Sequence, residues 1–326
     1  MKTRIQTPTE SYITLYDTPV KFRDNQLKVL WTADEINLEK DVHDILTNCT
    51  DAERHGIYTT LKLFTHYEMK AGEDYWTGRF MKMFPRHEFT SMASVFGMFE
   101  LTVHAPFYNK INILLNSHDD NFYTSYVQSP VLKRRMEYID AIINSDDDLV
   151  SLAGFSLVEG VILYSNFAYL KHFQSMGKNK LVNVVRGINF SVRDENMHSL
   201  ASAWCFRELC KERKITPWEK EILEKRIIGV VTDIYDHESA IINMLFEKGD
   251  IEGINATQMH LFVVSRINTC LVNLGLSPWI EYPGTDFIGE WFYKGINNYQ
   301  MNDFFSGAGR EYVRNWNEEQ FVWNVY

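Results

Sequence analysis

The sequence predicts an all-α protein, and three observations support this fold class. Hydrophobic residues recur at helical spacing over long stretches, as between Ala52 and Met83. The predicted helices follow one another without βαβ alternation, and the chain has no glycine-rich phosphate-binding loop. The 326 residues are 45% hydrophobic and include only 8 prolines and 17 glycines, a composition that can bury a large core. Because no Pro/Gly/Ser-rich linker divides the middle of the chain, we expect one large domain.

The N-terminal segment is predicted to be an arm followed by a helix. Residues 1–30 contain two prolines and short alternating stretches, which indicate extended structure. Thr32 and Glu35 have the spacing of a capping box, which predicts a helix that continues to about Leu46. Further helices are predicted over residues 52–83, 88–116 with a kink near Pro106, 126–144, 149–176, from the turn at 177–179 to Thr216, 217–247, and from 256 to Gly275. The aromatic-rich tail from Pro278 is predicted to be irregular with short helices.

Composition and charge restrict the function classes. The formal net charge of -10 argues against a nucleic-acid-binding surface, which needs clustered Lys and Arg. The four cysteines form no C-x-x-C pair or disulfide framework, which fits a reducing compartment. The N-terminus lacks the apolar core of a signal peptide, and we expect no run of about 18 apolar residues that could span a membrane. A soluble cytoplasmic protein is therefore expected.

Two isolated acids lie within strongly apolar helical patterns. Glu68 continues a stripe formed by Ile57, Leu61 and Phe64, and Glu159 is the single charged residue in "FSLVEGVILYSNFAYL". A helix that is apolar all round is buried, and a buried ionised carboxylate is costly unless it is paired. These acids therefore require protons, partner charges or metal ions.

Two further acids each have a histidine on the same helix face. Glu195 and His198 are three residues apart, and Glu100 and His104 are four apart. Either pair alone is more often a surface or internally satisfied pair than a metal site. Four acids and two histidines on four predicted helices instead have the ligand composition of a carboxylate-bridged dimetal bundle. Carboxylate oxygens with two imidazoles and no thiolate favour iron or manganese.

The chain resembles the radical-generating small subunit of class I ribonucleotide reductase, in the ferritin-like superfamily, from Trp31 to about Tyr312. The resemblance implies a ferritin-like helical bundle with additional helices and an aromatic C-terminal tail. The matching motifs are "RDE-x-x-H" at residues 193–198, "H-x-x-x-Y" at His104 and Tyr108, the helical glutamate Glu159 with Tyr164, Glu68 with Gly72, and the tail motif of Phe304, Phe305, Ser306, Gly307 and Tyr312.

The resemblance implies a ligand set with two departures from the family pattern. The first ligand is usually aspartate but here is the longer Glu68, with Glu73 as the alternative. The family's E-x-x-H spacing would place the acid at Leu101, whereas the acid is Glu100. A single π-bulge would absorb the extra residue and return Glu100 to the metals. The implied ligands of two Fe or Mn ions are Glu68, Glu100, His104, Glu159, Glu195 and His198.

The resemblance also implies a radical and a path for it. Tyr108 would carry the stable radical, although in isolation such a tyrosine is usually a core aromatic. His104, Asp194 and Trp31 would form the inner radical-transfer relay, and Tyr312 would extend it towards a partner. Without the resemblance, Trp31 and Tyr312 would be ordinary aromatic residues and Asp194 a polar helix residue.

The function implied is reduction of ribonucleotides to deoxyribonucleotides by a separate large subunit that receives the radical. We expect a homodimer in which residues 1–30 form the arm, 31–305 the dimetal domain and 306–326 a tail docking on the large subunit. Phe321, Trp323 and Tyr326 are the expected anchors of that tail. Direct reaction with oxygen and activation by a flavoprotein are both left open by the sequence.

Two other functions fit the metal-ligand composition alone. A dimetal oxidase or oxygenase would act on its own small substrate and would not need Trp31, Asp194 and Tyr312 in register. A metal-storage or purely structural bundle is the alternative from another class. Storage would bind many metals per chain in a shell assembly, whereas two metals per chain in a dimer would exclude it.

Overall fold

The computed structural model describes residues 3–281 and 286–293, and the all-α fold class is confirmed for them. Their only β-type pairing is an isolated bridge between Ile251 and Ile254. Residues 287–293 form a further short helix. The labelled elements are α1 (Asp17–Leu27), η1 (Ala33–Glu35), α2 (Glu39–His43), η2 (Asp44–Asn48), α3 (Asp51–Met69), η3 (Lys70–Phe80), α4 (Met81–Met83), α5 (His87–Phe99), η4 (Glu100–His104), α6 (Ala105–Leu114), α7 (Asp120–Thr124), η5 (Ser125–Gln128), α8 (Pro130–Ile143), α9 (Asp148–Leu157), η6 (Val158–Ile162), α10 (Leu163–Lys171), η7 (His172–Gln174), α11 (Val182–Arg213), α12 (Pro217–Leu245) and α13 (Ala256–Asn273).

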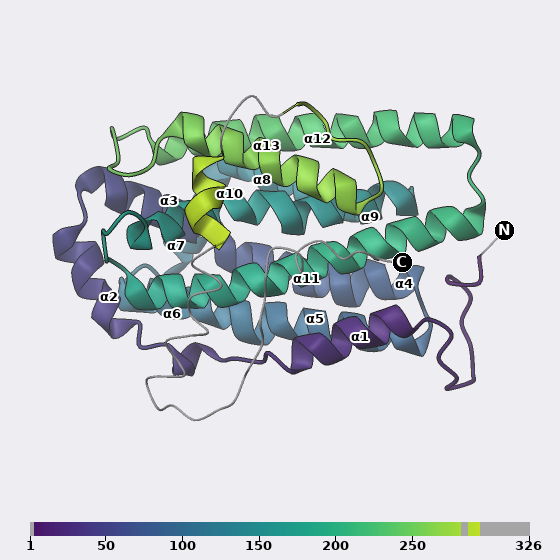
Figure 1. The fold of residues 1–326 in the computed structure, drawn as a ribbon. Coiled ribbons are helices and arrows are strands. Elements are labelled where there is room, and N and C mark those ends of the chain that lie inside the picture. The colour runs from purple at the N-terminus through teal and green to yellow at the C-terminus, as the bar shows by residue number, and fades with distance from the viewer. Residues whose placement is uncertain (1–2, 282–285, 294–326) are drawn as a thin grey trace.

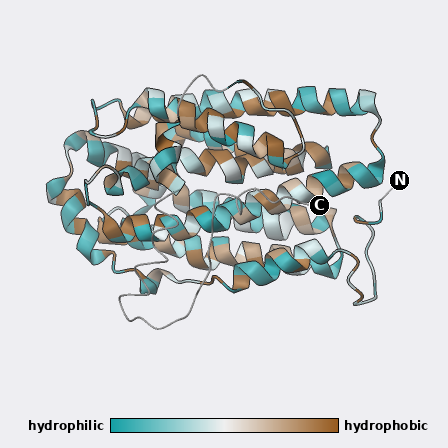
Figure 2. Cartoon of the chain, in the orientation of Figure 1, coloured by the Kyte–Doolittle hydropathy of each residue, from teal (hydrophilic) through white to brown (hydrophobic). Residues whose placement is uncertain are grey.

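The long helices lie side by side, with α11 running through the middle of the bundle (Figure 1). Helix α11 packs against α9 and α10, α1 packs against α5, and α12 packs against α13. The outer helices α1 and α12 carry both hydrophilic and hydrophobic residues (Figure 2). Such mixed helices bury one face and leave the other in water. The core therefore lies along α11 and the helices that surround it.

The extended arm predicted for residues 1–30 is corrected by the structure. This segment contains the helix α1, which buries Phe22 and Gln26. Pro19 lies in the first turn of α1, where a missing backbone N–H breaks no helical hydrogen bond. The proline was therefore a sign of a helix start rather than of extended chain. Ile5, still closer to the N-terminus, is also fully buried.

The helix predicted from Thr32 to Leu46 is interrupted. The capping box of Thr32 and Glu35 is present, but it begins only the single 3-10 turn η1. Ile36 then has extended backbone angles, and both Ile36 and Leu38 are 1% exposed. The break at Ile36 lets these two side chains enter the core, so burial outweighs local helix propensity here. Helix α2 and the π-helical segment η2 follow.

The long helices predicted over residues 52–83 and 88–116 are confirmed, each with a π-helical segment. Element η3 continues α3 without a break, and η4 joins α5 to α6. Pro106 is at the start of α6, directly after η4. Because the backbone hydrogen-bond pattern changes at this junction, the N–H group that proline lacks is tolerated there.

The segment Asp148–Gln174 is the one helix of the described residues whose length and composition would suffice to cross a membrane. No membrane-spanning segment was expected from the sequence, and 94% of the apolar window of this helix is buried inside the protein. It is therefore a core helix. Gly160 lies at its centre, where an added Cβ would be 2.3 Å from Cys270 Sγ and 2.7 Å from Ser199 Oγ. Glycine thus allows α11 and α13 to approach η6 closely.

Candidate dimetal centre

Six predicted ligand residues converge in the interior of the bundle from four helical segments. Glu68 is in the last turn of α3, Glu100 and His104 bound η4, Glu159 is in η6, and Glu195 and His198 are in α11. All six side chains are fully buried. The alternative first ligand, Glu73, is exposed on η3 and does not contribute.

The π-bulge expected at Glu100 is present as the segment η4. A π-helix has more residues per turn than an α-helix, so residues four apart come onto one side. His104 Nδ1 accordingly lies 2.8 Å from Glu100 Oε2. Glu159 is likewise in the π-helical segment η6, and η3 begins two residues after Glu68. Three of the four ligand-bearing helices therefore change their hydrogen-bond pattern at or beside the site.

The six residues form two overlapping groups whose ligand atoms lie within 4.8 Å of one another. We call these groups the first and second positions. Glu100 and Glu195 belong to both and are suited to bridge two ions. The first position is completed by Glu68 and His104, and the second by Glu159 and His198.

The unpaired polar atoms of this cluster fit two divalent cations. Both oxygens of Glu68 and of Glu195, Glu100 Oε1 and both ring nitrogens of His198 have no hydrogen-bond partner among the described residues. His198 Nδ1 is only 2.6 Å from Glu100 Oε1, yet the two atoms do not have hydrogen-bond geometry. An unsatisfied buried polar group costs about 1–3 kcal/mol. Oxygens and imidazole nitrogens that converge without pairing are the donor set that Fe or Mn requires.

The electrostatics of the cluster also call for cations. Burial, and then the neighbouring Glu100, raise the pKa of Glu68 well above its usual value. Burial, and then Glu195, do the same to the pKa of Glu159. Burial opposes protonation of His198, but Glu100 outweighs it and raises the His198 pKa to about 9. Without metal, these shifts favour protonation of Glu68, Glu159 and the His198 imidazole. Metal ions would displace those protons and neutralise the carboxylates.

Loading the site with Mn(II) or Fe(II) is expected to stabilise the protein strongly. A ligand that binds only the folded state adds about 2.7 kcal/mol at 100 times its dissociation constant, and here it also relieves repulsion between buried carboxylates. Thermal unfolding with excess metal and with a chelator measures the effect. A melting temperature that does not change with metal would contradict this assignment of the cluster.

A hydrogen-bonded chain leads from the cluster towards the surface. His104 Nε2 lies 3.2 Å from Asp194 Oδ2, and Trp31 Nε1 donates to the same oxygen at 2.8 Å. Arg193 donates to Asp194 Oδ1 at 3.1 Å, and Val29 O accepts from Arg193 at 2.9 Å. The sequence-predicted group of His104, Asp194 and Trp31 is thus in direct contact.

Tyr108 is fully buried beside the first position. Its hydroxyl donates to Ser191 Oγ at 3.3 Å. Its ring packs against Phe64 and Phe107, with centroids 4.5 and 5.1 Å apart. Phe167 in turn packs against Phe64. Sequence reasoning missed Phe64 as part of the pocket, although its place four residues before Glu68 put it on the same helix face.

Sequence reasoning also missed two residues that contact Glu159. Tyr67 donates to Glu159 Oε2 at 3.1 Å, and Trp76 Nε1 donates to Oε1 at 3.2 Å. Neither residue belongs to a motif. The only signal in the sequence is their position, because Tyr67 directly precedes Glu68 and Trp76 follows it by about two helical turns.

The predicted tail residues lie outside the described residues; they are Phe304, Phe305, Ser306, Gly307, Tyr312, Phe321, Trp323 and Tyr326.

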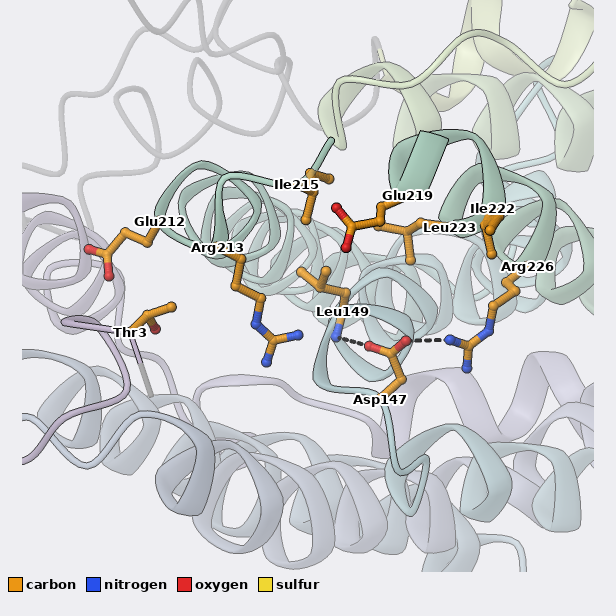
Figure 3. A pocket seen from close by; sticks show the side chains of 10 residues that line it. All are labelled: Thr3, Asp147, Leu149, Glu212, Arg213, Ile215, Glu219, Ile222, Leu223 and Arg226. Atoms are coloured by element: carbon orange, nitrogen blue, oxygen red, sulfur yellow. Dashed lines mark hydrogen bonds and ion pairs between the residues drawn. The ribbon is translucent and has the colours of Figure 1, made fainter. Parts of the chain in front are cut away.

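A surface pocket of about 700 Å³ is separate from this cluster and shares no residue with it. Figure 3 shows Asp147 between the backbone of Leu149 and the Arg226 side chain. Asp147 accepts from Leu149 N at 3.0 Å and pairs with Arg226. Because this acid is already paired within the protein, the pocket does not compete with the buried cluster as a candidate site.

Comparisons with known proteins agree with the geometry. The family described as "Ribonucleotide reductase, small chain" matches residues 13–283. The chain is 24% identical over 304 residues to a probable ribonucleoside-diphosphate reductase small subunit of Invertebrate iridescent virus 3, covering 87% of this chain and 78% of that one. It is 25% identical over 272 residues to the ribonucleoside-diphosphate reductase small chain of Acanthamoeba polyphaga mimivirus, covering 79% of this chain and 61% of that one.

Solved structures have the same fold. The dimanganese(II)-NrdF of Streptococcus sanguinis has a TM-score of 0.75 at 19% identity, covering 84% of this chain and 94% of that one. The R2 subunit of ribonucleotide reductase from Clostridium botulinum has a TM-score of 0.76 at 20% identity, covering 90% and 96%. These similarities confirm the ferritin-like helical bundle. With the family match over most of its length, the chain belongs to the ribonucleotide reductase small-chain family.

Proposed function

We propose that, in this small subunit of a ribonucleoside-diphosphate reductase, the six buried residues hold two Fe or Mn ions and Tyr108 carries the radical. The observation that supports this most strongly is the sharing of Glu100 and Glu195 between two ligand groups. Each of these two shared carboxylates has two oxygens, so one oxygen could serve the first position and the other the second. The bound metals, once oxidised by oxygen or by superoxide from an activating flavoprotein, would supply the one-electron oxidising power that a tyrosine requires.

Tyr108 is favoured as the radical site by its surroundings. It lies one helical turn after His104, which contacts Glu100 and Glu195. Its ring is covered by Phe64 and Phe107, and its exposure is 0%. The aromatic neighbours exclude water, and burial raises the pKa of the hydroxyl well above its usual value. A radical at this position would be shielded from reductants in solution.

The chain of His104, Asp194 and Trp31 is proposed to carry the electron between the metal site and the subunit surface. Asp194 is fully buried, and burial opposes its ionisation. Arg193, and then His104 and Trp31, outweigh burial and lower the Asp194 pKa below its usual value. The charged carboxylate accepts from both rings at once, which fixes the tautomer and orientation of His104.

Asp194→Asn is expected to reduce reductase activity by about 100-fold, as loss of a partner behind a metal-bound histidine does. The amide keeps the size of the side chain but cannot accept from both rings through a single charged oxygen. Tyrosyl-radical yield by electron paramagnetic resonance and turnover with the large subunit are measured together. The relay assignment fails if turnover per radical is the same as in the wild type.

The partners follow from the family and from the sequence. The large subunit would bind the ribonucleotide, which fits the absence of a nucleotide-binding motif from this sequence. We propose that residues 306–326 dock on it through Phe321, Trp323 and Tyr326, that Tyr312 passes the radical on, and that residues 31–305 form the dimetal domain. A cytoplasmic homodimer is proposed, with oxygen, or superoxide delivered by an activating flavoprotein, as the oxidant.

Reconstitution with a large subunit tests the proposed function directly. We expect ribonucleoside-diphosphate reduction only when both subunits and metal are present, and two metals per chain. Anomalous scattering at the Fe and Mn edges would identify the ions and their ligands together. Oxidation of a small substrate by this chain alone, without reductase activity in the reconstituted pair, would favour a dimetal oxidase instead.

A further inference from the structure

Two residues that belong to no sequence motif contact Glu159, a candidate ligand of the second position. Tyr67 and Trp76 each donate to a different oxygen of Glu159, at 3.1 and 3.2 Å. All three side chains are buried, at 3%, 0% and 0% exposure. Among the described residues, these are the only hydrogen bonds that the Glu159 carboxylate accepts from side chains outside the six candidate ligands. The direction of this carboxylate is therefore set by two neutral donors.

Trp76 also contacts the other unshared ligand of the second position. Its ring lies edge-on to His198 with centroids 5.6 Å apart, and Phe96 covers the same imidazole at 4.2 Å. His198 Nδ1 points towards Glu100 and Glu195, at 2.6 and 3.4 Å. His198 Nε2 has no hydrogen-bond partner among the described residues. On the side of the ring away from Glu100 and Glu195, aromatic packing rather than a hydrogen-bonded carboxylate therefore holds this histidine.

The first position is supported in a different way. His104 has Asp194 behind it at 3.2 Å, which fixes its tautomer and increases its basicity as a ligand. Among the described residues, Tyr67 and Trp76 make no hydrogen bond or ring contact with Glu68 or His104. The two positions share Glu100 and Glu195 but differ in the residues that orient their other ligands. A change in Tyr67 or Trp76 should consequently act on one position alone.

We infer that Tyr67 and Trp76 are positioning residues that set the metal affinity of the second position. The inference rests on the proposed dimetal function and adds the residues that distinguish its two positions. Tyr67 is next to the first-position ligand Glu68 in sequence, so one turn of α3 serves both positions. Trp76 reaches Glu159 and His198 from the π-helical segment η3.

The test is an anaerobic Mn(II) titration of the full-length metal-free protein, in which the electron paramagnetic resonance signal of free Mn(II) gives the number of bound ions and their affinities. Tyr67→Phe and Trp76→Phe remove one donor each and keep an aromatic ring. Each is expected to weaken one Mn(II) by about 10–100-fold, the usual effect of losing a residue that orients a ligand, and to leave the other unchanged. Anomalous scattering at the Mn edge should locate the weakened ion between Glu159 and His198.

Tyr75→Phe is the matched control. Tyr75 is adjacent to Trp76, is equally buried and donates or accepts at Ser202 Oγ, 3.3 Å away, so its loss should leave both affinities unchanged. Equal weakening of both ions, or wild-type affinities in both variants, would overturn the inference while the dimetal centre stands. A wild-type protein that binds fewer than two Mn(II) per chain would remove the proposed function as well. Circular dichroism melting shows that each variant is folded, and the two variants test the inference independently.

Discussion

Tyr108→Phe is expected to abolish the tyrosyl radical and to lower reductase activity by more than about 1,000-fold, which corresponds to about 4 kcal/mol in the activation barrier. The phenylalanine ring keeps the packing against Phe64 and Phe107 but has no hydroxyl to lose a proton and an electron. The single hydrogen bond removed, to Ser191 at 3.3 Å, contributes about 1 kcal/mol to stability. The fold and the metal ligands should therefore be retained.

The measurement is electron paramagnetic resonance of the metal-loaded protein after oxygen exposure, with metal content determined on the same sample. Tyr164→Phe is the matched control. Tyr164 is also buried, at 1% exposure, but its hydroxyl donates to Val192 O at 3.2 Å and the Arg266 guanidinium lies 3.9 Å above its ring. This cation disfavours loss of an electron from the ring. A tyrosyl signal that persists unchanged in Tyr108→Phe with full metal content would exclude Tyr108 as the radical site.

The convergence of the six candidate ligands in one buried cluster was predictable, because burial makes an unpaired acid conspicuous in a sequence. Glu159 stands alone in an apolar helix, and a structural partner or a metal was required before any fold was known. The π-bulge at Glu100 was predictable from the resemblance, because the family's E-x-x-H spacing has one residue fewer between the acid and the histidine than this chain has. In both cases the constraint is local to one helix.

The features that were not predictable depend on contacts between distant segments. From the sequence, Tyr67 and Trp76 look like ordinary core aromatic residues. Only the fold shows that they contact Glu159, which is more than 80 residues away in sequence. Similarly, Ile36 leaves a helical pattern because the core accepts its side chain in extended conformation. Helix propensity within a short window carries no information about either contact.

Glu195→Gln is expected to weaken both metals by at least about 100-fold, because Glu195 belongs to both ligand groups and loss of one ligand charge affects each ion. Glu159→Gln, in contrast, removes charge from the second position alone and should weaken one metal. The two variants make the same chemical change at equally buried positions. Any difference between them therefore reports whether the carboxylate is shared.

The metal-free form should respond much less. Burial, and then the Glu195 charge, raise the pKa of neighbouring Glu159, but the same carboxylate lies 3.0 Å from His104 Nδ1 and 3.4 Å from His198 Nδ1. Removing the charge relieves repulsion and weakens an attraction at once, so metal-free Glu195→Gln should melt close to the metal-free wild type, while the stabilisation by metal largely disappears. Melting curves with chelator and with excess Mn(II) measure both effects. A variant that is destabilised without metal and still stabilised by it would show that Glu195 supports the fold rather than bridging two ions.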